Sequence, residues 1–184
     1  GSYVPLLKAI SKDPAMLVWL DSRKNKKNAP NENFARELME LFTMGEGTFA
    51  EKDVKEASRA FTGYFLVNGI FAFNEGQHDF GPKNFLSQSG HFSGDQIIDV
   101  IFQQPETAEY ISKKLFTFFV HDSPDIQTIE RLSAILRAND YNIKSVMEHL
   151  LSSEEFYSQR AYRSKIKTPA EFTVGLIRST GAET

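Results

Sequence analysis

The sequence predicts a mainly α-helical domain, an irregular bundle of about eight helices with a small two- or three-stranded antiparallel β insert. Residues that favour helix starts recur along the chain, and apolar residues follow them at helical spacing. One aromatic-rich stretch, at about residues 65–92, carries strand and turn signals instead. With 184 residues, 41% of them apolar, the chain is long enough for one domain with its own core.

Seven positions are typical of helix starts. Asp13 and Ser123 each precede a proline, whose missing N–H costs nothing at the first helical position, and Gln104 precedes a third. Four hydroxyl residues are followed three positions later by Glu or Gln. This is the spacing of a capping box, in which the cap and the third residue bind each other's backbone amides. The four are Thr48, Ser93, Ser152 and Thr168. We therefore predict a helix after each of the seven.

Apolar residues follow most of these starts at intervals of three and four, which places them on one face of a helix. The clearest stripe consists of Ile143, Val146, Met147, Leu150 and Leu151. A second stripe, after an Asn-rich start, consists of Phe34, Leu38, Leu41 and Phe42. We expect these faces to form the core.

The insert at 65–92 is predicted to be a β-hairpin followed by a short third strand. Residues 65–67 and 70–73 are apolar and flank Asn68-Gly69, a pair typical of the type I′ hairpin turn. The third strand is expected near residues 84–86. Seven of the 16 phenylalanines lie between Phe61 and Phe92, and we interpret them as the filling of a small packed sheet. The alternative is a ligand platform, including a carbohydrate-binding surface, although such platforms favour Trp and Tyr over Phe.

A cluster of charged residues is predicted to be a structural polar network. Glu32, Arg36 and Glu40 lie one turn apart on one helix face, and Glu37 lies three residues from Glu40. Arg59 on the next helix is expected to join them. The alternative, a carboxylate metal or acid–base site, would call for a histidine nearby, and the segment has none. If Arg36 is buried, its replacement by Ala should cost about 2–5 kcal/mol.

The loop that contains His78, Asp79 and Lys83 is the candidate functional loop. Imidazole and carboxylate groups are common metal ligands, and His91 is the nearest histidine that could complete a site with His78 and Asp79. Adjacent residues on an extended segment point to opposite sides, however. We therefore favour an ordinary turn before Gly81-Pro82, and we expect neither a metal nor another cofactor.

Composition excludes several function classes. The chain has no cysteine, which removes disulfides, thiol nucleophiles and thiolate metal sites. A formal net charge of -3 argues against a nucleic-acid partner. No run of about 18 apolar residues occurs, so we expect no transmembrane segment. Neither a phosphate-cradling Gly-rich loop nor a nucleophile elbow is present in the sequence.

The stretch at residues 29–45, APNENFARELMELFTMG, closely resembles the bacterial domain of unknown function 1800 family. The resemblance continues through residues 60–64, 78–83 and 165–172, and covers nearly the whole chain, although Tyr64 stands where the family typically has Trp. Members are usually much longer and many are exported. The resemblance therefore implies a fragment of a longer protein with a periplasmic or cell-envelope location. It supplies no activity, cofactor or catalytic residue.

These observations favour a non-catalytic scaffold or partner-binding domain. Its partner would be the remainder of its own full-length chain or another protein. The alternative is a metal-assisted hydrolase centred on the His78-Asp79 loop, with a bound water as the nucleophile.

Overall fold

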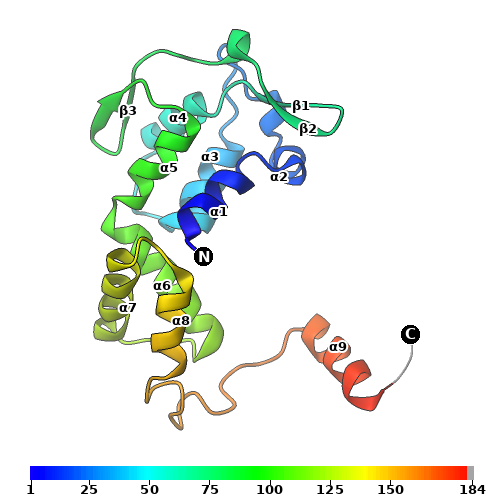
Figure 1. The fold of residues 1–184 in the computed structure, drawn as a ribbon, viewed down its shortest axis with the longest axis vertical. Helices are drawn as coiled ribbons and strands as arrows, with labels where there is room; N and C mark the ends of the chain where they lie inside the picture. The colour runs from blue at the N-terminus through cyan, green and yellow to red at the C-terminus, as the bar shows by residue number, and fades with distance from the viewer. Residues whose placement is uncertain (182–184) are drawn as a thin grey trace.

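The computed structural model describes residues 1–181, and over this range it is 55% helical, with nine α-helices and two small antiparallel sheets (Figure 1). The prediction of a mainly α-helical chain with a small β insert is confirmed. The helices are α1 (Tyr3–Ile10), α2 (Pro14–Trp19), α3 (Asn33–Glu37), α4 (Glu51–Ala60), α5 (Gly94–Phe102), α6 (Pro105–Phe119), α7 (Ile126–Ala138), α8 (Ile143–Leu151) and α9 (Pro169–Thr180). Short 3₁₀ turns occur at η1 (Ser22–Lys24) and η3 (Glu75–Gln77).

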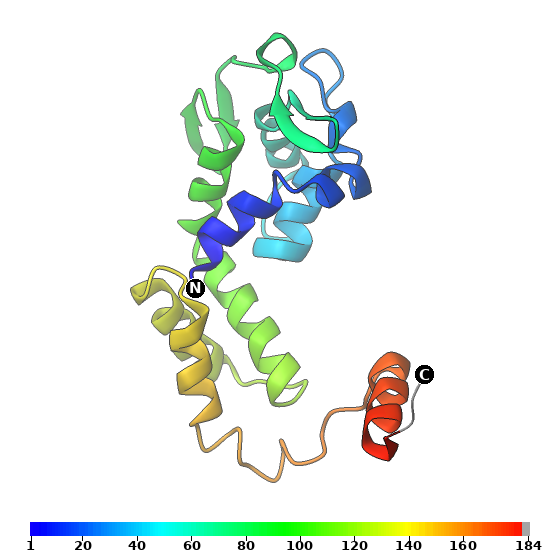
Figure 2. The same ribbon diagram turned by 45° about the vertical axis from the view of Figure 1, so that its right-hand side comes forward.

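The helices form two packed groups and one outlier. Helices α1 to α5 pack together with the strands at one end of the molecule, and α6, α7 and α8 pack against one another at the other end. Helix α9 lies apart from both groups, after an extended stretch at residues 164–168, in Figure 1 and in the turned view of Figure 2. Among the described residues, no helix combines the length and the apolar character needed to cross a bilayer.

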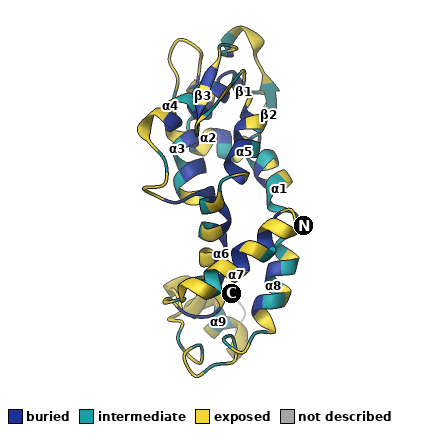
Figure 3. Ribbon diagram, turned by 90° about the vertical axis from the view of Figure 1, so that its left-hand side faces the viewer, coloured by how far each residue is buried: buried dark blue, intermediate teal, exposed yellow. Residues whose placement is uncertain are grey.

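One cluster of buried residues runs through both packed groups. At its strand-bearing end, the Phe61 ring packs edge-on against Phe34 and Tyr64, with ring centroids 4.9 and 5.6 Å apart. At the other end, Leu136 and Val146 are fully buried between α7 and α8. Figure 3 shows the buried residues on helix faces that turn toward one another, and α9 has no buried residue.

The strands form two separate hairpins. Strands β1 (Tyr64–Val67) and β2 (Ile70–Phe73) pair around Asn68 and Gly69, which both have positive φ, as the type I′ turn requires. The predicted third strand is β3 (Lys83–Phe85), but it does not join this sheet. It pairs with β4 (Gln88–Gly90), a strand that contains Ser and Gly and has no apolar alternation to predict it.

Four of the seven predicted helix starts are correct. Asp13 and Ser93 accept hydrogen bonds from the first-turn amides of α2 and α5, and Thr168 does the same for α9. Ser93 and Thr168 are also members of complete capping boxes. Gln104 precedes α6 with Pro105 at its first position, but its side chain makes no cap hydrogen bond.

The other three predicted starts are wrong. In two of them a nearby carboxylate caps the helix instead, and in the third the predicted start is the end of the preceding helix. Helix α4 begins after Ala50, whose amide donates to the Asp53 carboxylate at 3.0 Å, and not after Thr48. Asp125, two residues beyond Ser123, caps α7 through the Thr128 amide. Ser152 ends α8, and no helix follows it before α9.

A π-helical segment, η2 (Leu38–Thr43), continues α3 and breaks the predicted apolar stripe. The wider turn rotates Leu41 outward, and this residue is 47% exposed although the stripe placed it on the core face. Side chains that are distant in sequence donate hydrogen bonds to carbonyl groups of this segment. The Tyr3 hydroxyl donates to the Phe42 carbonyl at 3.0 Å, and the Lys114 ammonium donates to the Leu41 carbonyl at 2.8 Å.

Candidate functional site

The candidate loop, residues 78–83, is anchored by Thr62, which lies two residues beyond the end of α4. The His78 Nδ1 lies 2.7 Å from the Thr62 carbonyl oxygen, and the Asp79 amide donates to the Thr62 hydroxyl at 2.8 Å. Because a carbonyl oxygen only accepts, Nδ1 must be the nitrogen of His78 that donates. In the neutral ring, the second nitrogen, Nε2, is then an acceptor.

Asp79 is held by a guanidinium and by its own turn. Arg59 Nε donates to Asp79 Oδ2 at 2.7 Å, and the Gly81 amide donates to Oδ1 at 2.8 Å, which is an Asx turn. The hydrogen bond from Arg59 is the main reason that the pKa of Asp79 lies below its ordinary value, and the Gly81 amide adds to the effect. The carboxylate is therefore a fixed anion that positions the loop.

Lys83 closes the loop from inside. Its side chain is almost fully buried, and its ammonium donates to the carbonyl oxygens of Asp79 and Gly81 at 2.7 and 3.1 Å. Burial lowers the pKa of Lys83, since a charged amine is less favourable away from water. These contacts use the ammonium to hold two carbonyl groups of the turn.

One side of α4 binds both the candidate loop and the β3–β4 hairpin that follows it. Asp53 accepts a hydrogen bond from the Leu86 amide, and Glu56 accepts one from the Asn84 amide. Arg59 follows three residues later with its bond to Asp79. Sequence reasoning missed this role for Asp53 and Glu56. The positions of Asp53, Glu56 and Arg59, at successive intervals of three residues, were a signal that they share a helix face.

The three possible metal ligands do not converge. The His78 imidazole is tied to Thr62, Asp79 is tied to Arg59, and His91 Nδ1 lies 2.8 Å from the Phe80 carbonyl oxygen. Within residues 1–181, no three His, Asp or Glu side chains are grouped so that they could hold a metal ion. The hydrolase alternative therefore has no preformed ligand set in this part of the chain.

The charged cluster near α3 has a different membership from the expected one. Arg36 binds Glu32 and Glu40 at 3.1 and 3.4 Å, and it makes two 2.8 Å hydrogen bonds to Glu51, a partner that sequence reasoning missed. Arg59 belongs to a separate group with Glu56 and Asp79. Glu37, predicted to be a member, forms no ion pair within the described residues.

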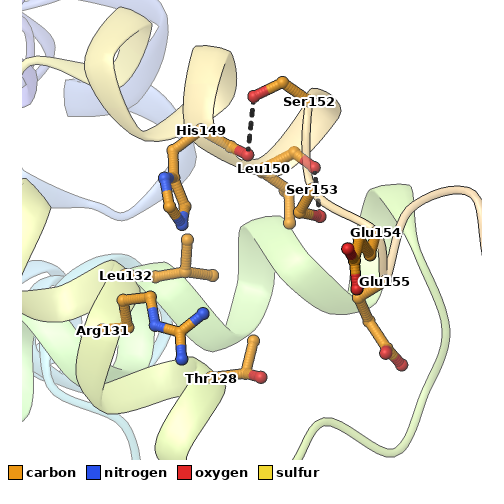
Figure 4. Close-up of a pocket in the computed structure, with 9 residues that line it drawn as sticks. All are labelled: Thr128, Arg131, Leu132, His149, Leu150, Ser152, Ser153, Glu154 and Glu155. Carbon is orange, nitrogen blue, oxygen red and sulfur yellow. Dashed lines mark hydrogen bonds between the residues drawn. The ribbon is translucent and has the colours of Figure 1, made fainter.

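A cavity of about 430 Å³ lies where α8 ends (Figure 4). Arg131 from α7 and His149 from α8 are directed toward the same space. Glu155 borders it, but the carboxylate of Glu155 is already bound by His121 Nε2 at 2.6 Å. The serines at this end of α8 donate to carbonyl groups of its last turn. These contacts terminate the helix and bring no reactive pair together.

Comparison with known proteins identifies a family and no function. The model of a family described as "Protein of unknown function (DUF1800)" matches residues 1–184, the whole chain. Neither the curated proteins nor the solved structures include a match.

Proposed function

We propose that this chain, which belongs to the DUF1800 family, is a non-catalytic assembly module whose C-terminal helix, α9, binds the body of a second copy. "Body" denotes residues 1–159. The proposal accounts for a helix that has caps and an apolar face but no buried residue in the part of the chain that the structure describes.

The exposure of α9 is the observation that carries the proposal. None of its residues is buried, and Phe172 and Leu176, one turn apart, are 58% and 52% exposed. An isolated helix of fewer than about 12–15 residues is marginal in water, and α9 has 12 residues. Helical structure in such a segment is therefore best stabilised by burying its apolar face against another surface, as in helix-in-groove recognition.

Charge favours the body of this same protein as that surface. Residues 160–181 contain five basic residues and one acidic residue, whereas the body contains 22 acidic and 16 basic residues. Arg163, Lys167 and Arg178 form no ion pair within residues 1–181, so these cations can also face a negative surface. Opposite charge attracts the two parts and orients their encounter.

The body also exposes apolar side chains that α9 could cover. Several lie on α1, α2, α6 and α7, namely Leu6, Val18, Trp19, Phe118, Phe119 and Ile126. Because α9 lies away from its own body, a symmetric pair of chains would exchange these helices, each filling the surface of the other. Such self-complementary twofold contacts are the commonest form of protein oligomer.

Sedimentation velocity on the full chain at about 10–100 μM tests this proposal, a range in which moderate protein contacts are populated. The wild-type chain is expected to sediment as a dimer. The double variant Phe172→Asp/Leu176→Asp should sediment as a monomer, because charge on the apolar face of α9 opposes burial.

The control is Ile70→Asp, which also places a carboxylate at an exposed apolar position, here the first residue of β2, and this variant should remain dimeric. A wild-type chain that is monomeric throughout, or a double variant that is still dimeric, would contradict the proposal. A monomeric control variant would contradict it as well, because docking would then not depend on α9 specifically.

A further inference from the structure

A small pocket beside His78 has a composition that neither its packing nor the proposed assembly explains. It has a volume of about 270 Å³ and lies between the end of α4, the first hairpin and the start of α5. This is just below the range of about 300–1,000 Å³ that is typical of sites for drug-sized ligands, so it suits a fragment such as one sugar ring. Three of the residues that line it, His78, Tyr64 and Asp95, each carry a polar atom that has no hydrogen-bond partner among residues 1–181.

The first of these atoms is Nε2 of His78. The residue is only 6% exposed, and its Nδ1 is fixed by the Thr62 carbonyl. The direction of the Nε2 lone pair is therefore fixed, and His78 is one of the residues that line the pocket. An acceptor that has no protein partner is a place where a ligand donor can gain binding energy.

The second atom is the hydroxyl of Tyr64, which is 7% exposed. Burial is the main reason that the pKa of Tyr64 is raised, and the charge of Asp95 adds to it, so the hydroxyl stays protonated and can both donate and accept. Gly94 leaves room for it, since a Cβ at that position would lie 2.7 Å from the Tyr64 oxygen.

The third atom is Oδ1 of Asp95, which is buried and unpaired, while Oδ2 accepts a hydrogen bond from the Lys12 ammonium at 2.7 Å. Lys12 and Asp95 both line the pocket, and their charges cancel. The pocket therefore presents two acceptors and one hydroxyl in a surrounding with no net charge.

Aromatic rings form the remaining wall. The Phe71 ring centroid lies 5.1 Å from that of Tyr64, and the Phe73 ring centroid lies 5.1 Å from that of His78. Both phenylalanines line the pocket beside the polar atoms. Sites that combine an apolar wall with a few placed polar groups are typical of small-molecule binding.

We propose that this pocket binds a neutral polyhydroxy ligand through a vicinal diol, as in a sugar ring or a polyol. Two adjacent hydroxyls can donate to His78 Nε2 and Asp95 Oδ1 and can accept from Tyr64. Because the charges of Lys12 and Asp95 cancel, neither an organic cation nor an anion gains a net attraction to the pocket. A purely apolar ligand would leave all three polar atoms unpaired.

NMR titration of the full chain with methyl α-D-glucopyranoside tests the proposal, with the backbone amide signals of the pocket residues Gly94 and Asp95 as the readout. A ligand of this size should bind with a Kd on the order of 1–10 mM. Cyclohexanol, which has one hydroxyl, and cyclohexylammonium, which is cationic, should both bind more weakly than the glucoside. If either binds as tightly, the assignment to a neutral diol is wrong, and absence of glucoside binding at about 100 mM overturns it entirely.

Two nearly isosteric variants locate the ligand. Tyr64→Phe removes only the hydroxyl, and His78→Asn keeps a donor for the Thr62 carbonyl while removing Nε2. Each should weaken glucoside binding about two- to tenfold, the loss of one hydrogen bond. His91→Asn, at a histidine outside the pocket, should leave binding unchanged. Melting temperatures close to wild type show that the variants are folded, and unchanged binding in both pocket variants would refute the site.

Discussion

Arg59 Nε donates a 2.7 Å hydrogen bond to Asp79 Oδ2 and so joins α4 to the loop at residues 78–83. The same Asp79 carboxylate accepts the Gly81 amide through Oδ1, and the Asp79 carbonyl oxygen accepts the buried ammonium of Lys83. The position of His78, one residue earlier, depends on this fixed turn. The loop is thus a rigid support for one wall of the pocket.

Asp79→Asn should lower the free energy of unfolding at neutral pH by about 1.5–3 kcal/mol, the usual contribution of a hydrogen bond to a charged group. The folded-state pKa of Asp79 is depressed below the unfolded value of about 3.9, so its stabilisation is complete above that pH and is lost as pH falls through the folded pKa. Urea unfolding at neutral pH and at about pH 2.5 checks this. The gap between wild type and variant should shrink in acid, and a constant gap would disprove the assignment to the carboxylate.

Arg36→Ala should reduce the free energy of unfolding by about 1 kcal/mol, because the ion pairs of this guanidinium are exposed to solvent and water screens them. The Arg36 side chain is 32% exposed and that of Glu51 is 67% exposed, so the burial on which the larger sequence-based value depended is not present. Glu37→Ala, at a neighbour without an ion pair in the described chain, should change stability by less than about 0.5 kcal/mol. Urea unfolding of both variants provides the measurement, and a loss above about 2 kcal/mol for Arg36→Ala would show that the network is effectively buried.

Gly63→Ala should destabilise the protein more than Gly69→Ala. Both glycines have positive φ, where a side chain costs about 1–2 kcal/mol. At Gly63 a Cβ would also lie 2.6 Å from the Asn74 carbonyl oxygen, whereas at Gly69 nothing lies within 4 Å. Thermal unfolding of the two variants compares them directly. Equal melting temperatures would mean that the backbone near Asn74 moves aside freely.

Local sequence signals predicted those parts of the fold whose partners are close in sequence. The Ser93 box and the hairpin at Asn68-Gly69 each depend on contacts within a few residues, and both were predicted correctly. The π-helical segment could not be predicted in this way. It is accompanied by hydrogen bonds from Tyr3 and Lys114 to its carbonyls, and these residues lie 39 and 73 positions from their partners.

The same limit applies to the candidate site. His78 was singled out because Asp79 follows it in the sequence. The Asp79 carboxylate, however, binds Arg59, and the residues that line the pocket with His78 come from other segments. Tyr64 begins the hairpin and Asp95 lies in the first turn of α5. Only the packing of α4, the hairpin and α5 brings them to one pocket, and no spacing in the sequence encodes that packing.

Energy transfer between two labelled copies tests the central claim, that α9 docks on another chain. The chain has no cysteine, so a single introduced cysteine can be labelled selectively. One batch carries a donor at Ser179→Cys in α9, and the other carries an acceptor at Lys24→Cys, an exposed position on the body. Mixing the two batches should produce transfer that is abolished by Phe172→Asp/Leu176→Asp in both. Absence of transfer between copies at concentrations up to about 100 μM would contradict the account.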